Sequence, residues 1–159
     1  LRLGFDLIRS NPKICGYSIT SMVDGNVAEG LWTFRRELKP GMLETLRDGW
    51  APLRWCLFVE PLHGYAGRPI DLEAVLANED VLRPGTYPAH LKICGSAGTV
   101  WEQRIDFSVP APVKGSDAPL TVTVLRVSVT LDIPPGVYEF AASQEQGGAP
   151  VNGRREFCL

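Results

Sequence analysis

Apolar and polar residues alternate with a period of two from Leu53 to the end of the chain. The first of these runs places four apolar side chains on one face: Leu53, Trp55, Leu57 and Val59. Comparable stripes recur at 70–76, 87–93, 101–109, 120–133 and 138–140, with turn signals such as Pro84-Gly85 between them. Successive side chains of a strand point to opposite faces, so each run predicts a strand buried on one side. About seven such strands predict an antiparallel β-sandwich of immunoglobulin-like type.

One of these runs changes phase in its middle. Leu120, Val122 and Val124 share one parity, whereas the apolar residues from Leu125 to Ile133 take the other. A slip of one residue moves every later side chain to the opposite face. We therefore expect a β-bulge, or a change of sheet, near Val124 and Leu125.

The first fifty residues follow a different pattern. Apolar residues at helical spacing open the chain, and Asn11-Pro12 ends that helix. A mostly apolar run over 14–20 lacks alternation, as in a strand covered on both faces. A long loop over 21–34 follows, and Pro40 then opens a second helix. A buried parallel strand needs neighbours on both edges, so we expect the chain to be the C-terminal piece of a larger protein.

Composition excludes several classes of function. The formal net charge is only −2, so neither a nucleic-acid partner nor a membrane surface is expected. No apolar run approaches the roughly 20 residues that span a bilayer. The four cysteines form no CxxC pair, and His63 and His90 complete no zinc pattern, so no metal is expected. Buried reduced thiols are favoured over disulfides. Glycine loops that cradle phosphate are absent from the sequence, and no cofactor is expected.

The loop after the apolar run 14–20 holds the candidate binding residues. Asp24, Glu29 and Trp32 combine two carboxylates with an indole. Ligands of α/β folds bind beyond the carboxyl ends of parallel strands, and sugar sites pair aromatic faces with carboxylates. We therefore predict substrate binding by these three residues. The alternative is a surface loop with solvated acids, in which the Trp covers an edge of the fold.

Several segments resemble glycoside hydrolases of family 2 and their relatives in clan A. The resemblance lies in Arg9-Ser10-Asn11-Pro12 with Gly16-Tyr17-Ser18-Ile19-Thr20, in Gly30-Leu31-Trp32 and Lys39-Pro40, and in Ala51-Pro52-Leu53-Arg54. It implies a (β/α)8 barrel that hydrolyses glycosidic bonds with two carboxylates, both upstream of Leu1. No catalytic residue is expected in this chain. The implied fold class is α+β, with the terminal βα unit of the barrel over 1–51 and an all-β immunoglobulin-like sandwich over 52–159.

The main functional expectation is the C-terminal part of a glycoside hydrolase, inactive by itself. Its partners would be the carbohydrate substrate of the parent enzyme and the missing portion of the barrel, against which it packs. One alternative is a non-catalytic carbohydrate-binding or structural sandwich. Another is a complete small α+β protein in which the first fifty residues pack on the sandwich.

Overall fold

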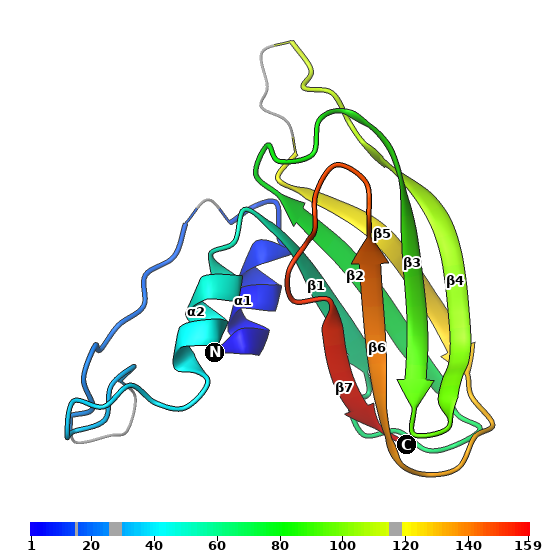
Figure 1. The fold of residues 1–159 in the computed structure, drawn as a ribbon, viewed down its shortest axis with the longest axis horizontal. Coiled ribbons are helices and arrows are strands. Elements are labelled where there is room, and N and C mark those ends of the chain that lie inside the picture. Colours follow the sequence, from blue (N-terminus) through cyan, green and yellow to red (C-terminus); the bar gives the residue numbers. More distant parts are fainter. Residues whose placement is uncertain (15, 26–29, 115–118) are drawn as a thin grey trace.

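A computed structural model of the chain describes residues 1–14, 16–25, 30–114 and 119–159. Within these residues, two short helices precede seven strands (Figure 1). The helices are α1 (Arg2–Arg9) and α2 (Met42–Gly49). The strands are β1 (Leu53–Glu60), β2 (Pro69–Asn78), β3 (Gly85–Gly95), β4 (Gly98–Val109), β5 (Thr121–Thr130), β6 (Val137–Gln144) and β7 (Arg154–Cys158).

The strands form two antiparallel sheets that face each other. In the described chain, one sheet has the order β1-β2-β5 and the other the order β4-β3-β6-β7. Constant-type immunoglobulin domains place the fourth strand in the same sheet as the first two. Here β4 pairs with β3 instead, so the fourth strand has moved to the other sheet. The class is an antiparallel β-sandwich with this variant of immunoglobulin-like strand order.

The alternating stripes form the core between the sheets, as the sequence predicted. Residues from both sheets share one buried cluster that includes Trp55, Leu72, Leu91 and Phe140. The phase change in β5 is also confirmed as a bulge. Ala74 of β2 lies opposite Leu125, whereas Val75 lies opposite Thr123, so Val124 is the extra residue. Both Val124 and Leu125 are buried, which explains why the apolar parity changes there.

Tyr138 fixes the corner that leads into β6. Its hydroxyl donates to the carbonyl oxygen of Pro134 at 2.5 Å, four residues upstream. A tyrosine at this place, near the start of the sixth strand, is a hallmark of immunoglobulin-like sandwiches. Its ring also packs on Gly95, where an added Cβ would lie 2.6 Å from a ring carbon. The contact therefore joins the β5–β6 corner to the end of β3.

Helices α1 and α2 pack on each other through one aromatic residue of α1. Phe5 of α1 is buried and meets the rings of Tyr17 and Trp50 edge to face, with centroid distances of 5.6 and 5.9 Å. A Cβ at Gly49 would lie 2.5 Å from the Phe5 ring, so glycine permits the close approach of α2. The described residues contain no helix long and apolar enough to cross a membrane.

The expected α+β fold with a terminal barrel unit is wrong. Residues 14 and 16–20, predicted to form a buried parallel strand, make no strand at all, and Ile14 is 38% exposed. The structure is broadly all-β, with the two helices as short additions to a pair of antiparallel sheets. The physical reason is pairing: no described strand runs beside residues 14 and 16–20 to satisfy their backbone groups, so these residues form a connector and not a strand.

Candidate functional site

Residues 21–25 and 30–39, called the arm below, contain two of the three predicted binding residues, Asp24 and Trp32. The arm lies on the far side of α2 from the sandwich (Figure 1). A short backbone ladder closes it: Asp24 N–H donates to the Trp32 carbonyl and Trp32 N–H to the Met22 carbonyl, both at 2.9 Å. Gly30 permits this closure, because an added Cβ would lie 2.3 Å from the carbonyl carbon of Val23. The ladder thus places Asp24 and Trp32 side by side.

The Asp24 carboxylate holds the arm together. Its Oδ1 accepts from the Lys39 ammonium at 2.7 Å and from the Gly30 N–H at 2.8 Å. The hydrogen bond from Lys39 lowers the pKa of Asp24, and the Gly30 N–H adds to this against the opposing effect of burial. Asp24 is therefore ionised at neutral pH and cannot serve as a general acid. The carboxylate can still accept further hydrogen bonds from a ligand.

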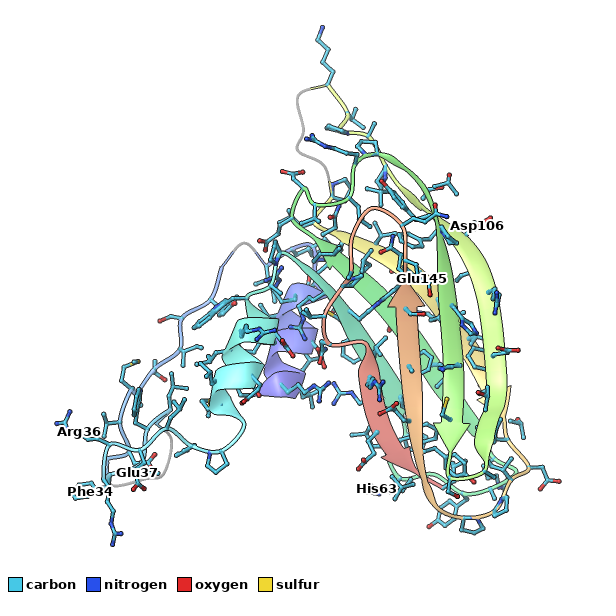
Figure 2. All side chains as sticks on the ribbon, viewed as in Figure 1. Phe34, Arg36, Glu37, His63, Asp106 and Glu145 are labelled. Atoms are coloured by element: carbon cyan, nitrogen blue, oxygen red, sulfur yellow. The ribbon has the colours of Figure 1, made fainter. Side chains whose placement is uncertain are left out.

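The arm presents aromatic rings to solvent. Trp32 is 37% exposed and Phe34 is 82% exposed, and Figure 2 shows Phe34 with Arg36 and Glu37 at the outer end of the arm. Sequence reasoning missed Phe34, although a phenylalanine followed by two arginines in a predicted loop was a usable signal. Glu29, the third predicted binding residue, lies outside the described residues. The substrate-binding roles of Asp24, Glu29 and Trp32 remain predictions.

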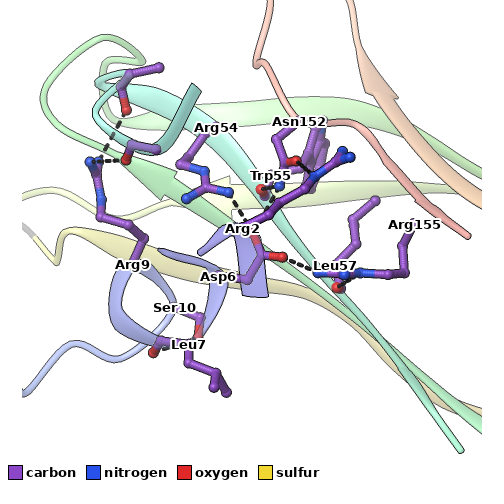
Figure 3. Close-up of polar contacts among 12 residues, drawn as sticks. Arg2, Asp6, Leu7, Arg9, Ser10, Arg54, Trp55, Leu57, Asn152 and Arg155 are labelled. Carbon is purple, nitrogen blue, oxygen red and sulfur yellow. Dashed lines mark hydrogen bonds and ion pairs between the residues drawn. The ribbon is translucent and has the colours of Figure 1, made fainter. Parts of the chain in front are cut away.

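A buried polar cluster fastens α1 to the sandwich (Figure 3). The Asp6 carboxylate accepts from Arg54 Nη2 at 2.5 Å, from Asn152 Nδ2 at 2.8 Å and from the Arg155 guanidinium. Arg2 adds a hydrogen bond from Nε to Asn152 Oδ1 at 2.7 Å. The partners come from α1, β1, β7 and the segment before β7, so the cluster spans the seam between the two sheets. Sequence reasoning did not find it.

Burial governs the chemistry of this cluster. Asp6 has no exposed surface and Arg54 is 1% exposed. Burial raises the pKa of the Asp6 carboxyl, while the charges of Arg54, Arg155 and Arg2 act against that rise. Two of the Arg54 donors, Nε and Nη1, have no acceptor among the described residues. Arg155 borders an open hollow beside Leu3 and Phe58, whereas Asp6 and Arg54 line none of the described pockets, so the buried pair acts as a structural joint.

A shallow polar groove of about 320 Å³ lies on the outer face of the four-stranded sheet. Asp106 and Glu145 line it near the same end of the sheet (Figure 2). His90 also lines it, and its Nε2 lies 2.9 Å from the Glu102 carboxylate. No Phe, Tyr or Trp ring lines this groove among the described residues, so it lacks the stacking surface typical of a sugar site.

The cysteines that the structure describes differ in burial: Cys56 is buried, as predicted, whereas Cys94 and Cys158 are half-buried. Cys56, Cys94 and Cys158 are free, and Cys15 lies outside the described residues. Burial raises the pKa of Cys56 to about 12, so its thiol stays protonated and unreactive. Within the described chain, no three side chains of His, Cys, Asp or Glu gather in a way that could hold a metal ion.

Comparisons with known proteins assign no family to this sandwich. No protein-family model matches the sequence, and no curated protein matches it. Among solved structures, the alkylpurine DNA glycosylase AlkC of Pseudomonas fluorescens aligns with 74% of this chain at 19% identity and TM-score 0.48. β-Glucosidase 3B of Thermotoga neapolitana aligns with 69% at 12% identity and TM-score 0.39. The chain spans about a third of the first protein (33%) and 16% of the second. CsgH of R. palustris aligns with 67% of this chain, at 16% identity and TM-score 0.33, and 91% of CsgH is covered.

Proposed function

We propose that this chain is the non-catalytic C-terminal part of a glycoside hydrolase. In this proposal the sandwich is an accessory domain, residues 1–50 attach it to the catalytic domain, and the catalytic carboxylates lie upstream. The glycosidase assignment rests on the sequence resemblance, which is strongest over residues 11–40. The role in attachment rests on the structure.

The observation that carries the proposal is the distribution of exposed apolar side chains. Of the fifteen large apolar side chains that are exposed in the described chain, nine lie in residues 1–50. They are Leu1, Leu3, Leu7, Ile14, Met22, Trp32, Phe34, Leu43 and Trp50. The sandwich buries its own core, whereas this segment leaves apolar surface in water. Concentrated exposed apolar surface is typical of a protein–protein contact.

Two observations argue against catalysis by the chain itself. Asp24 is held ionised by Lys39 and Gly30, so it cannot donate a proton to a leaving group at neutral pH. Asp106 and Glu145 lie in a shallow groove that no Phe, Tyr or Trp of the described chain lines. Glycoside hydrolysis needs one protonated and one ionised carboxyl on opposite sides of a bound sugar ring. Attachment to a catalytic domain therefore accounts for more of the structure than an independent site does.

A comparison of two proteins tests the proposal. The complete product of the reading frame that encodes these residues and the chain 1–159 are assayed against the same panel of aryl glycosides. We expect turnover by the complete product and none by the chain 1–159.

Two results would overturn the proposal. One is a complete product that cleaves no glycoside. The other is turnover by the chain 1–159 that disappears on replacing a single carboxylate, for example in Asp106→Asn or Glu145→Gln.

A further inference from the structure

The residues that the structure describes cover the outer face of the three-stranded sheet only in part. Helix α1 packs against β1, and beyond it lies an open groove of about 710 Å³, called the α1–sheet groove below. Leu7 of α1 forms one wall, Phe58 of β1 and Val75 of β2 lie on its floor, and Thr123 and Arg126 of β5 form the other side. The groove therefore runs across all three strands of the sheet.

The apolar surface of this groove is continuous with the existing contact between α1 and β1. Leu3 and Leu7 are one helical turn apart and both are exposed. Leu3 borders a neighbouring hollow that shares Phe58 and Glu60 with the groove. Beneath α1, the residues Cys56, Val75 and Ala77 form a second buried apolar cluster, with Phe58 packed at its margin. Helix α1 thus covers this face of the sheet over β1, and the described residues leave the face over β2 and β5 partly open.

The dimensions of the uncovered face suit one more helix. Packed helices lie about 8–10 Å apart, and neighbouring strands lie about 4.8 Å apart. A helix beside α1 would therefore lie about two strands away from β1. The sheet has that width, since β2 and β5 follow β1 in its order. An extended peptide would cover only half of this space.

The charge of the groove indicates which residues should lie beside the apolar face of a segment that binds there. Glu60 and Glu73 line it, and Asp71 lines the adjoining hollow. Arg126 pairs with Glu73, whereas Glu60 and Asp71 have no ion-pair partner among the described residues. The rim is therefore net acidic. An occupant with Lys or Arg beside its apolar stripe complements it.

We propose that the α1–sheet groove binds an amphipathic, basic-flanked helix of the catalytic domain, which lies alongside α1 over β2 and β5. The inference rests on the proposed function, because that function supplies the domain to which the helix belongs. It adds the place of docking and the secondary structure and charge of the docked element. Binding of an amphipathic helix in an apolar groove is a common mode of protein–protein recognition.

Labelling of an introduced cysteine in the groove tests the inference. Thr123→Cys places a thiol on the exposed side of β5 within the groove, and Ser108→Cys places a control thiol on exposed β4 of the other sheet. Each variant is made in the complete product and in the chain 1–159, and maleimide labelling is followed for the peptide that carries the new thiol. In the complete product we expect labelling at position 123 to slow about tenfold or more, with position 108 unchanged. Adding Leu7→Glu to the complete product restores fast labelling at position 123.

Two outcomes overturn the inference, and both are read independently of the glycosidase assay. Equal labelling at position 123 in both proteins means that no helix docks there, even if the complete product hydrolyses glycosides. Protection within the chain 1–159 that grows with its concentration assigns the groove to a second copy of this chain. If position 123 is protected in a complete product that cleaves no glycoside, the groove is still a docking site, but the proposed glycosidase function is wrong.

Discussion

Asp6 and Arg54 are 48 residues apart in the sequence, yet they meet in the interior between α1 and β1. Asn152 and Arg155 reach the same carboxylate from the other end of the chain. No local pattern predicts such a meeting, because hydrophobic periodicity reports only on which face of an element a residue lies. Arg54 even interrupts the apolar run of β1 as an ordinary polar-face residue would. Of the residue contacts described, those of this cluster were therefore the least predictable from the sequence.

The joint yields the first prediction. Asp6→Asn removes the one carboxylate that faces the Arg54 and Arg155 guanidiniums and leaves the Arg54 charge buried without compensation. Removing one partner of a buried pair costs about 3–5 kcal/mol of unfolding free energy. Urea denaturation measures the loss.

A matched control uses the exposed ion pair of the same helix. Arg9 contacts Glu79 at 2.7 Å, and the Glu79 side chain is 47% exposed. Glu79→Gln should change stability by no more than about 1 kcal/mol. An Asp6→Asn variant as stable as Glu79→Gln would refute the role of the cluster as a joint.

The strands and helices were predictable to different degrees. Period-two alternation predicted the strands of the sandwich, because a strand buried on one face alternates apolar and polar residues. The change of parity predicted a bulge or a change of sheet near Val124. The apolar run over 14–20 led to a wrong strand prediction because it has no such alternation. A run without alternation does not distinguish a strand buried on both faces from an apolar connector. The helices on either side were predicted near their observed places, since Pro12 and Pro40 mark their boundaries.

Gly30 gives a prediction for the arm as an element. In Gly30→Ala the new Cβ meets the Val23 backbone, so the ladder between residues 22–24 and Trp32 must open. We expect amide hydrogen exchange over residues 31–39 to accelerate about tenfold or more, with the strands unaffected. Gly25→Ala is the control, because nothing lies within 4 Å of its added Cβ. Equal exchange in the two variants would show that the ladder does not depend on the close approach at Gly30.

The ion pair between Asp24 and Lys39 predicts how the arm responds to pH. The folded pKa of Asp24 lies below its unfolded value of 3.8, so the unfolded arm binds more protons between the two values. The pair therefore stabilises the arm above pH 3.8, and its contribution is lost as pH falls through the folded pKa. Carboxyl NMR titration should show the pKa of Asp24 rising toward 3.8 in Lys39→Gln. An unchanged pKa in that variant would exclude Lys39 as the main cause.

At the scale of the whole molecule, two regions bury their apolar residues to different extents. The sheets enclose a shared core with side chains from all seven described strands or their immediate continuations, including Phe107, Leu125 and Phe157. Residues 1–50 are fastened to that sandwich at Asp6, yet most of the exposed large apolar side chains of the described chain belong to them. The proposed attachment to a catalytic domain requires exposed apolar side chains on a segment that is held against the sandwich.

Amide hydrogen exchange of residues 1–50 tests whether this segment docks on a catalytic domain. Exchange is measured by mass spectrometry in the chain 1–159 and in the complete product of its reading frame, under the same conditions. We expect slower exchange across α1, the arm and α2 in the complete product, with the four-stranded sheet unchanged. Identical exchange of residues 1–50 in the two proteins would contradict it.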